Sequence, residues 1–350
     1  MTNTELFYFT GKCLTLDENP AFRTEILKKI YTGQINWNKF IWQCSNHLIL
    51  QVIYLKFRKH ELLSELPDQL TKKLSIIHQL NCDRNASILK QVDDITFALN
   101  KENIFPLFMK GTGNLLGGLY QDIGERIIGD IDFLVPEKDY LKAAGIMLAQ
   151  GYEKPTPDYG LSKSAKHYPR LFRKDVPADV EIHRAPVNIV HSKYFNTKMI
   201  FRDKKCVPAH SGCYIPSEEH NIFQNFIHSQ FDHQGYRLAD ASFRDLYDLY
   251  LHSRRKKTIT NSIPYKRKAL NYLALVDKIL GQVLFKSSPK TIRSSLFCFR
   301  FDFYHNYPAL SKVFIYIPHR IYRRYICNLV LFIFSKRERR RLISRLKDYI

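Results

Sequence analysis

Three carboxylates in two short apolar runs are the residues best suited to chemistry. Asp130 and Asp132 stand two positions apart in the run 130–135, and Glu181 stands in the alternating run 178–185. Side chains two residues apart in a strand share a face, so Asp130 and Asp132 should project together. Such a pair is costly unless a cation neutralises it, and hard oxygen ligands suit Mg²⁺, with Mn²⁺ as a substitute. If the two strands adjoin, the three carboxylates predict a two-metal site for phosphoryl-type transfer.

A glycine-containing turn precedes the first carboxylate pair. It reads Lys110-Gly111-Thr112-Gly113 and follows the apolar run 105–109. Glycine allows the backbone to come close to a phosphate, and the free N–H groups of a helix that follows would favour an anion. The Lys110 ammonium adds a positive charge. The turn is therefore a candidate phosphate-binding element.

Strands and helices must position these groups. Apolar runs predict strands at 105–109, 130–135 and 178–185, and helices are expected at 114–120 and 138–150. This alternation of strand and helix predicts an α/β (α+β) fold with a small mixed sheet.

Helical regions are expected on both sides of this core. The clearest helices are predicted at 85–100, 217–231 and 238–253, with Ser217 as an N-cap. The chain is thus predicted to divide into a helical N-terminal region (1–104), a catalytic core (105–215) and a helical C-terminal region with a basic tail (216–350).

Positive charge is concentrated in the last third of the chain. The 350 residues carry a net charge of +21, and residues 251–350 hold 23 Lys/Arg against 4 Asp/Glu. The apolar share of 45% excludes a disordered chain. The basic third predicts a polyanion or an anionic membrane as partner. Peripheral membrane contact through 320–350, with Cys327–Phe334 as the apolar face, is favoured over nucleic-acid binding because Arg clusters flank an apolar run and no nucleic-acid motif is present. The plain alternative is an Arg-rich helical surface without a partner.

The cysteines and the apolar runs bear on the compartment. Seven cysteines without tight spacing argue against a disulfide framework. The first twenty residues do not read as a secretory signal, and no apolar run reaches about 18 residues. We therefore expect a cytoplasmic protein, with peripheral contact at the inner membrane face as an open alternative.

Two further groups, one of cysteine and histidine and one of histidine and aspartate, are less specific signs of a functional site. Cys206, His210 and Cys213 are close enough to suggest zinc, but no fourth ligand follows them. His228 and His233 lie at the end of a predicted helix, near Asp232. They are interpreted either as acceptor-site groups or as residues that only satisfy local hydrogen bonds.

The stretch FPLFMKGTGNLLGGLYQDIGERIIGDIDFLV resembles a family within the DNA polymerase β-like nucleotidyltransferase superfamily, the bacterial uncharacterised nucleotidyltransferases. That family typically shows Lys-Gly after the first strand, a Tyr ending the helix, Gly-x-Arg and Asp-Ile-Asp. The likeness extends over roughly residues 30–255. It implies a polymerase β-like core and Mg²⁺-dependent transfer of a nucleoside monophosphate from an NTP to an acceptor hydroxyl, with release of pyrophosphate.

The resemblance also implies roles for individual residues. Asp130 and Asp132 would be ligands shared by two metal ions, and Glu181 would bind the second ion and help to deprotonate the acceptor. The implied nucleotide-binding residues are Lys110, Gly111, Thr112, Gly113 and Arg126. Of these, Lys110 and Arg126 would contact the phosphates. The acceptor stays open among a glycan, a small molecule, a peptide and RNA.

Three alternatives remain at this point. Gly117-Gly118 lies closer to the Asp pair, as is usual in the superfamily, but Lys110-Gly111 directly follows an apolar strand and is favoured for holding the triphosphate. The same fold also supports transfer of a phospho-alcohol from a CDP-activated donor to a glycan. A third hypothesis is a non-catalytic protein on a retained scaffold that binds nucleic acid or membrane.

Overall fold

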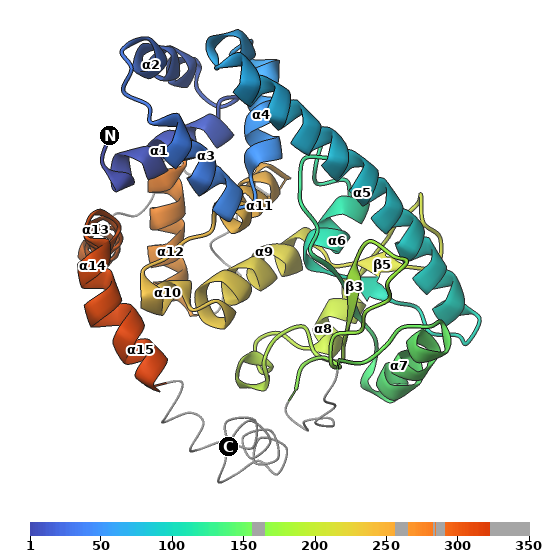
Figure 1. The fold of residues 1–350 in the computed structure, drawn as a ribbon. Coiled ribbons are helices and arrows are strands. Elements are labelled where there is room, and N and C mark those ends of the chain that lie inside the picture. The colour runs from blue at the N-terminus through green and yellow to red at the C-terminus, as the bar shows by residue number, and fades with distance from the viewer. Residues whose placement is uncertain (156–164, 256–264, 283, 285–290, 323–350) are drawn as a thin grey trace, which may run out of the picture.

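A five-stranded mixed sheet lies on one side of the computed structural model, which describes residues 1–155, 165–255, 265–282, 284 and 291–322 (Figure 1). The strand order is β3-β2-β1-β5-β4. Strands β2 and β3 are parallel, as are β1 and β5, whereas β1 runs antiparallel to β2 and β4 antiparallel to β5. The strands are β1 (Leu107–Phe108), β2 (Asp130–Leu134), β3 (Asp179–His183), β4 (Lys205–Cys206) and β5 (Tyr214–Ile215).

The predicted α/β fold with a small mixed sheet is confirmed. The first three strands lie within the predicted apolar runs. The sequence did not indicate β4 and β5, because two residues are too few to show a period of two.

Helix α5 (Asp68–Asn100) packs along the sheet and against α7 (Tyr140–Ala149). Its last turns bury apolar side chains together with the strand residues whose side chains face away from the carboxylates, among them Ile88, Val92, Ile95, Leu99, Ile131, Phe133, Val180 and Ile182. The helix begins well before the predicted 85–100. Its earlier buried positions include His78, Asn81 and Asn85, whose polar side chains interrupt the apolar period.

Of the remaining helices, α6 and α8 lie beside the sheet, and most of the others lie on the side of the molecule away from it (Figure 1). They are α1 (Asn3–Leu14), α2 (Pro20–Tyr31), α3 (Trp37–Asn46), α4 (Leu50–Lys59), α6 (Lys110–Leu116), α8 (Thr197–Arg202), α9 (Glu218–Ile227), α10 (Gly235–Leu238), α11 (Phe243–Arg255), α12 (Lys266–Ile279), α13 (Ile292–Asn306), α14 (Pro308–Ser311) and α15 (Ile317–Ile321).

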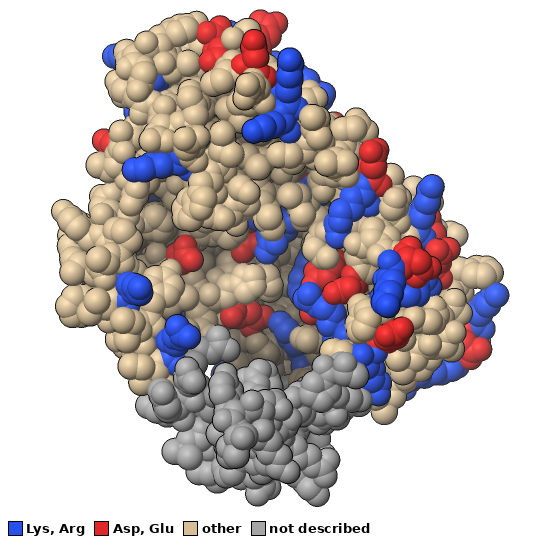
Figure 2. Space-filling view, in the orientation of Figure 1, with Lys and Arg blue, Asp and Glu red and all other residues tan. Residues whose placement is uncertain are grey.

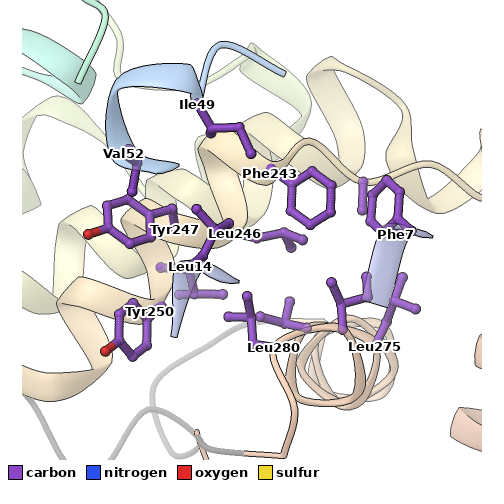
Figure 3. Close-up of a cluster of buried hydrophobic side chains, with 14 of the residues drawn as sticks. Phe7, Leu14, Ile49, Val52, Phe243, Leu246, Tyr247, Tyr250, Leu275 and Leu280 are labelled. Atoms are coloured by element: carbon purple, nitrogen blue, oxygen red, sulfur yellow. The ribbon is translucent and has the colours of Figure 1, made fainter. Parts of the chain in front are cut away.

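Helices from both ends of the chain share one hydrophobic core (Figure 3). Phe7 of α1 stacks on Phe243 of α11 with ring centroids 4.0 Å apart, and it meets Phe301 of α13 edge-on at 5.3 Å. This packing joins segments that are more than two hundred residues apart in sequence. The division of the chain into three regions stays a prediction.

Helix α9 begins as the sequence predicts and ends differently. The Ser217 side chain accepts a hydrogen bond from the His220 backbone, which confirms the N-cap. After Ile227 the chain continues as a π-helical turn, His228–Asp232, and α11 starts only at Phe243. The predicted helix 238–253 is therefore shifted toward the C-terminus.

None of the described helices combines the length and hydropathy needed to cross a bilayer. Residues 323–350, with the apolar run Cys327–Phe334, lie outside the described part of the chain.

Candidate active site

Strands β2 and β3 bring the three predicted carboxylates together. In their parallel register Asp130 stands opposite Asp179, and Asp132 stands opposite Glu181. Only 2% of Asp132 and 8% of Glu181 are exposed. Asp130, Asp132 and Glu181 all line one cavity of about 500 Å³. The alternation predicted for both strands therefore places the three carboxylates at a common site.

The cavity lies between the sheet and the helices that follow it. Lys110 and Gly111 line it next to the carboxylates, and α9, the π-turn and α11 supply the facing wall. A hollow with both acidic and basic side chains in its walls is visible in Figure 2. The site thus combines buried negative charge with cations that can bind a phosphate.

Two basic side chains bind the carboxylates directly. Lys110 Nζ lies 2.6 Å from Asp132 Oδ1 and 3.9 Å from Glu181 Oε2. Arg170 Nη2 lies 2.8 Å from Asp130 Oδ2 and 2.9 Å from Glu181 Oε1. His183, which is fully buried, contacts Asp132 Oδ1 through Nε2 at 2.7 Å. Each carboxylate of the cluster therefore has a positive or hydrogen-bonding partner.

Burial and charge act on these carboxyls in opposite directions. Burial raises the pKa of Asp130, and the Asp132 carboxylate raises it further. Burial also opposes ionisation of Asp132, but the Lys110 ammonium and His183 hold its pKa well below the ordinary value. Burial is likewise outweighed at Glu181, whose pKa is lowered by contact with His183. Asp132 and Glu181 are thus kept ionised, the form that binds a cation.

The turn after β1 is tighter than the sequence predicts. The Met109 backbone N–H donates to the Asp132 carbonyl at 2.9 Å, and helix α6 begins at the next residue instead of at 114. Lys110 makes this turn in the left-handed region, with φ at +53°. A side chain in this conformation is uncommon and strained. The turn places the Lys110 ammonium over the carboxylates of β2 and β3.

The glycines of this segment have different surroundings. Gly111 lines the cavity. A Cβ on Gly113 would lie 2.5 Å from the Phe108 carbonyl oxygen, so Gly113 permits close packing of α6 on β1. The Thr112 hydroxyl donates to the Asp130 carbonyl at 3.1 Å. Neither Thr112 nor Gly113 is among the described residues that line the cavity, and the nucleotide contacts of this segment stay a prediction.

The alternative glycine pair lies outside the cavity. Gly117 and Gly118 are not among its described lining residues, and their carbonyls accept hydrogen bonds from the Arg255 guanidinium. Their position favours Lys110-Gly111 over Gly117-Gly118 as the phosphate-binding segment.

Arg126 lines the cavity but is already paired. Its Nε and Nη2 atoms donate to the Asp248 carboxylate of α11 at 3.1–3.2 Å, and both side chains are buried. The Tyr120 hydroxyl donates to the same carboxylate at 2.9 Å. Asp122 and Glu125 are the acidic residues next to Arg126 in the sequence, but the partner of its guanidinium lies 122 residues away.

Arg170 was not singled out from the sequence. Leu171 bridges Val180 in antiparallel fashion, which sets Arg170 beside Glu181 at the outer edge of β3. Pro169 makes the segment 165–172 resemble a loop. Had residues 167–183 been interpreted as a β-hairpin, the sequence would have placed Arg170 beside Glu181.

The zinc pattern at residues 206–213 does not form a cluster in the described structure. His210 Nδ1 lies 2.6 Å from Asp93, and the Cys213 thiol donates to the His210 carbonyl. Cys206 is exposed on β4. The groupings of metal-ligating side chains found among the described residues lie elsewhere.

Comparison with known proteins agrees with this geometry. A family model described as an uncharacterised nucleotidyltransferase matches residues 33–274, which include the whole sheet and the described cavity residues. Neither the curated proteins nor the solved structures contain a match. The carboxylates of β2 and β3, the lysine–glycine turn and the family match lead to one conclusion: the chain belongs to the family of uncharacterised nucleotidyltransferases.

Proposed function

We propose that the chain transfers a nucleoside monophosphate from an NTP to an acceptor hydroxyl, with release of pyrophosphate, and that the reaction depends on Mg²⁺. One observation carries the proposal. Asp130, Asp132 and Glu181 converge from two registered strands on the cavity that Lys110 and Gly111 also line. The family match supports nucleotidyl transfer in general, and the finer description rests on this geometry.

The donor set fits a divalent cation. Asp130, Asp132 and Glu181 offer carboxylate oxygens only, which are the ligands of Mg²⁺ and Mn²⁺. Lys110 and Arg170 lie between pairs of these carboxylates, so the cluster already attracts positive charge. Ions held by the three carboxylates would supply positive charge to the attacking and leaving oxygens during phosphoryl-type transfer.

The chain's own residues have distinct tasks in this proposal. Lys110 exchanges its contact with Asp132 for the donor's phosphates, since an ammonium binds either anion as a point charge. Gly111, without a side chain, lets the donor approach the backbone of the turn. Glu181 is assigned to the acceptor side, where its ionised oxygen can accept the hydroxyl proton. Positioning of donor and acceptor then provides much of the rate.

The test is a labelling assay with the full chain. Each of the four NTPs, labelled at the α-phosphate, is incubated with the protein, Mg²⁺ and cell extract, and acceptor labelling and pyrophosphate release are measured. We expect labelling with at least one NTP and its loss in Asp132→Asn. Asp179→Asn is the matched control, because Asp179 stands in register opposite Asp130 but is not among the described residues that line the cavity.

Two results would contradict the proposal. One is an absence of labelling with every NTP, and the other is equal labelling by wild type and Asp132→Asn. Release of CMP from a CDP-activated donor, in place of pyrophosphate from an NTP, would assign the phospho-alcohol reaction instead.

A further inference from the structure

Two histidines and an aspartate form a separate group on the cavity wall that faces the sheet. His228 and His233 belong to the end of the α9 segment, and Asp245 lies in the first turn of α11. One ligand atom of each lies within 4.8 Å of those of the other two, and all three residues line the cavity. This group is distinct from the carboxylates of β2 and β3.

The π-helical turn explains why two histidines five positions apart face each other. The His233 backbone N–H donates to the His228 carbonyl at 2.9 Å, the i→i+5 bond of a π-turn. In an α-helix, positions five apart point in widely different directions, since 3.6 residues complete one turn. Here the imidazole centroids lie 4.0 Å apart. Single π-turns are rare and occur frequently at functional sites.

The Asp245 carboxylate has an unsatisfied oxygen within this group. Asp245 is only 5% exposed, and its Oδ2 accepts no hydrogen bond from any described residue. His233 Nδ1 lies 3.9 Å from that oxygen, which is too long for a hydrogen bond. Arg244 Nε lies 3.7 Å from the other oxygen, Oδ1. A buried carboxylate oxygen without a partner is costly, and it points to a ligand at Oδ2.

The histidines are also available for coordination. The His228 ring packs against the His233 ring, and His233 Nδ1 lies beyond hydrogen-bond distance of Asp245 Oδ2. An imidazole binds a metal through an unprotonated ring nitrogen, and each of these rings offers one.

The dimensions suit a transition-metal ion. Bonds of about 2.0–2.2 Å to nitrogen and oxygen set tetrahedral ligands roughly 3.4 Å apart. The 3.9 Å between His233 Nδ1 and Asp245 Oδ2 closes to this value with a small movement of His233, whose side chain is 51% exposed. Two imidazoles and one carboxylate favour Zn²⁺ over Mg²⁺, which prefers oxygen ligands.

We propose that His228, His233 and Asp245 bind a divalent transition-metal ion, Zn²⁺ in the first instance, with an open coordination position toward the cavity. This site is independent of the magnesium site proposed above. It faces the carboxylates across the same cavity, so its open position is directed at the space that the substrates would share.

Metal binding by the full chain tests the proposal without any nucleotide. Zn²⁺ is titrated against a chelating dye with wild type and with Asp132→Asn, which disrupts the other possible metal-binding group on this cavity, Asp132, Glu181 and His183. We expect about one equivalent of tightly bound Zn²⁺, with affinity reduced tenfold or more in His233→Gln and in Asp245→Asn. His233 is half-exposed, so His233→Gln is the variant that should keep its fold. Near-ultraviolet circular dichroism checks that fold.

A second cluster supplies the control. His78, Cys82 and Asp122 also lie within reach of one another, and Cys82→Ser should leave zinc affinity unchanged. Co²⁺ adds a spectroscopic readout, because a histidine and carboxylate site gives visible bands without a thiolate charge-transfer band. Unchanged affinity in His233→Gln, a lack of zinc binding by wild type, or a thiolate band lost in Cys82→Ser would each overturn the assignment.

Discussion

Lys110 Nζ lies 2.6 Å from Asp132 Oδ1, so an ammonium on the turn after β1 holds the most buried carboxylate of β2. The contact depends on the left-handed backbone of Lys110 and on the bond from Met109 to the Asp132 carbonyl. It joins the candidate phosphate-binding turn to the candidate metal ligands. The two halves of the site are therefore coupled through one ion pair.

Substitution of Lys110 should weaken binding of the NTP donor. In Lys110→Met the phosphates of the NTP donor lose the ammonium charge that would bind them. We expect NTP affinity to fall by tenfold or more, since a charge-assisted contact contributes about 1.5–3 kcal/mol. Lys110→Arg should restore part of it. The measurement is calorimetric titration with Mg²⁺-NTP. Equal affinity in wild type and Lys110→Met would show that this residue does not contact the donor.

Substitution of Asp130 or Asp132 should lower activity much more than substitution of Asp179 on the neighbouring strand. Asp130→Asn and Asp132→Asn should each lower nucleotidyl transfer by about a thousandfold or more, because metal ligation supplies several kcal/mol of transition-state stabilisation. Asp179→Asn should stay within a few-fold of wild type. A single-turnover assay with excess protein measures the rates. Full activity in Asp132→Asn at any Mg²⁺ concentration is incompatible with the proposed site.

The Arg126–Asp248 pair should matter mainly for stability. Arg126→Met leaves a buried carboxylate without its cation, and we expect a loss of about 3–5 kcal/mol in the free energy of unfolding. The double variant Arg126→Met/Asp248→Leu should recover much of this loss. Urea denaturation provides the measurement.

The same double variant also tests the phosphate role predicted for Arg126. If the folded double variant binds Mg²⁺-NTP as tightly as wild type, Arg126 acts in packing alone. A tenfold or greater loss of affinity in the folded protein would instead support the phosphate contact.

Two glycines near the cavity should respond differently to alanine. In Gly113→Ala the new Cβ would lie 2.5 Å from the Phe108 carbonyl oxygen, and we expect a loss of about 1–3 kcal/mol from forced backbone movement. Gly129→Ala is the matched control, because nothing lies within 4 Å of its Cβ position. Thermal unfolding of both variants compares them, and equal melting temperatures would contradict the close packing of α6 on β1.

Acid should weaken the fold through Glu218. Burial opposes ionisation of this carboxyl, but His252 and Arg255 lower its pKa from 4.5 to about 2. A carboxyl with a lowered folded-state pKa stabilises the protein above its unfolded-state pKa, and this contribution is lost as the pH falls from about 4.5 toward 2. In Glu218→Gln the melting temperature should be lower near pH 7 and should decline less between pH 5 and 3.

The exposed Glu153 supplies the control for this pH dependence. Glu153→Gln should follow the wild-type profile of melting temperature against pH. A Glu218→Gln profile parallel to wild type would show that the contacts with His252 and Arg255 do not set the acid sensitivity.

Local patterns in the sequence were enough for strands β1, β2 and β3 and for the carboxylates on β2 and β3. A period of two over 130–135 and 178–185 requires that Asp130 and Asp132 share a face and that Glu181 lie on the corresponding face of its strand. The Ser217 N-cap was equally readable, since it depends on residues within one helical turn. The family resemblance over the segment 105–135 rested on the same local features.

Only the tertiary structure decided which distant residues complete the site. Asp248 reaches Arg126 across 122 residues, and Asp245 joins His228 because α11 packs against α9. The pairing of strands and the packing of helices that are far apart in the sequence depend on the burial of apolar faces by the whole chain. Local residue spacing does not encode them. The π-turn that sets His228 beside His233 is likewise a product of packing, because an α-helical period would separate them.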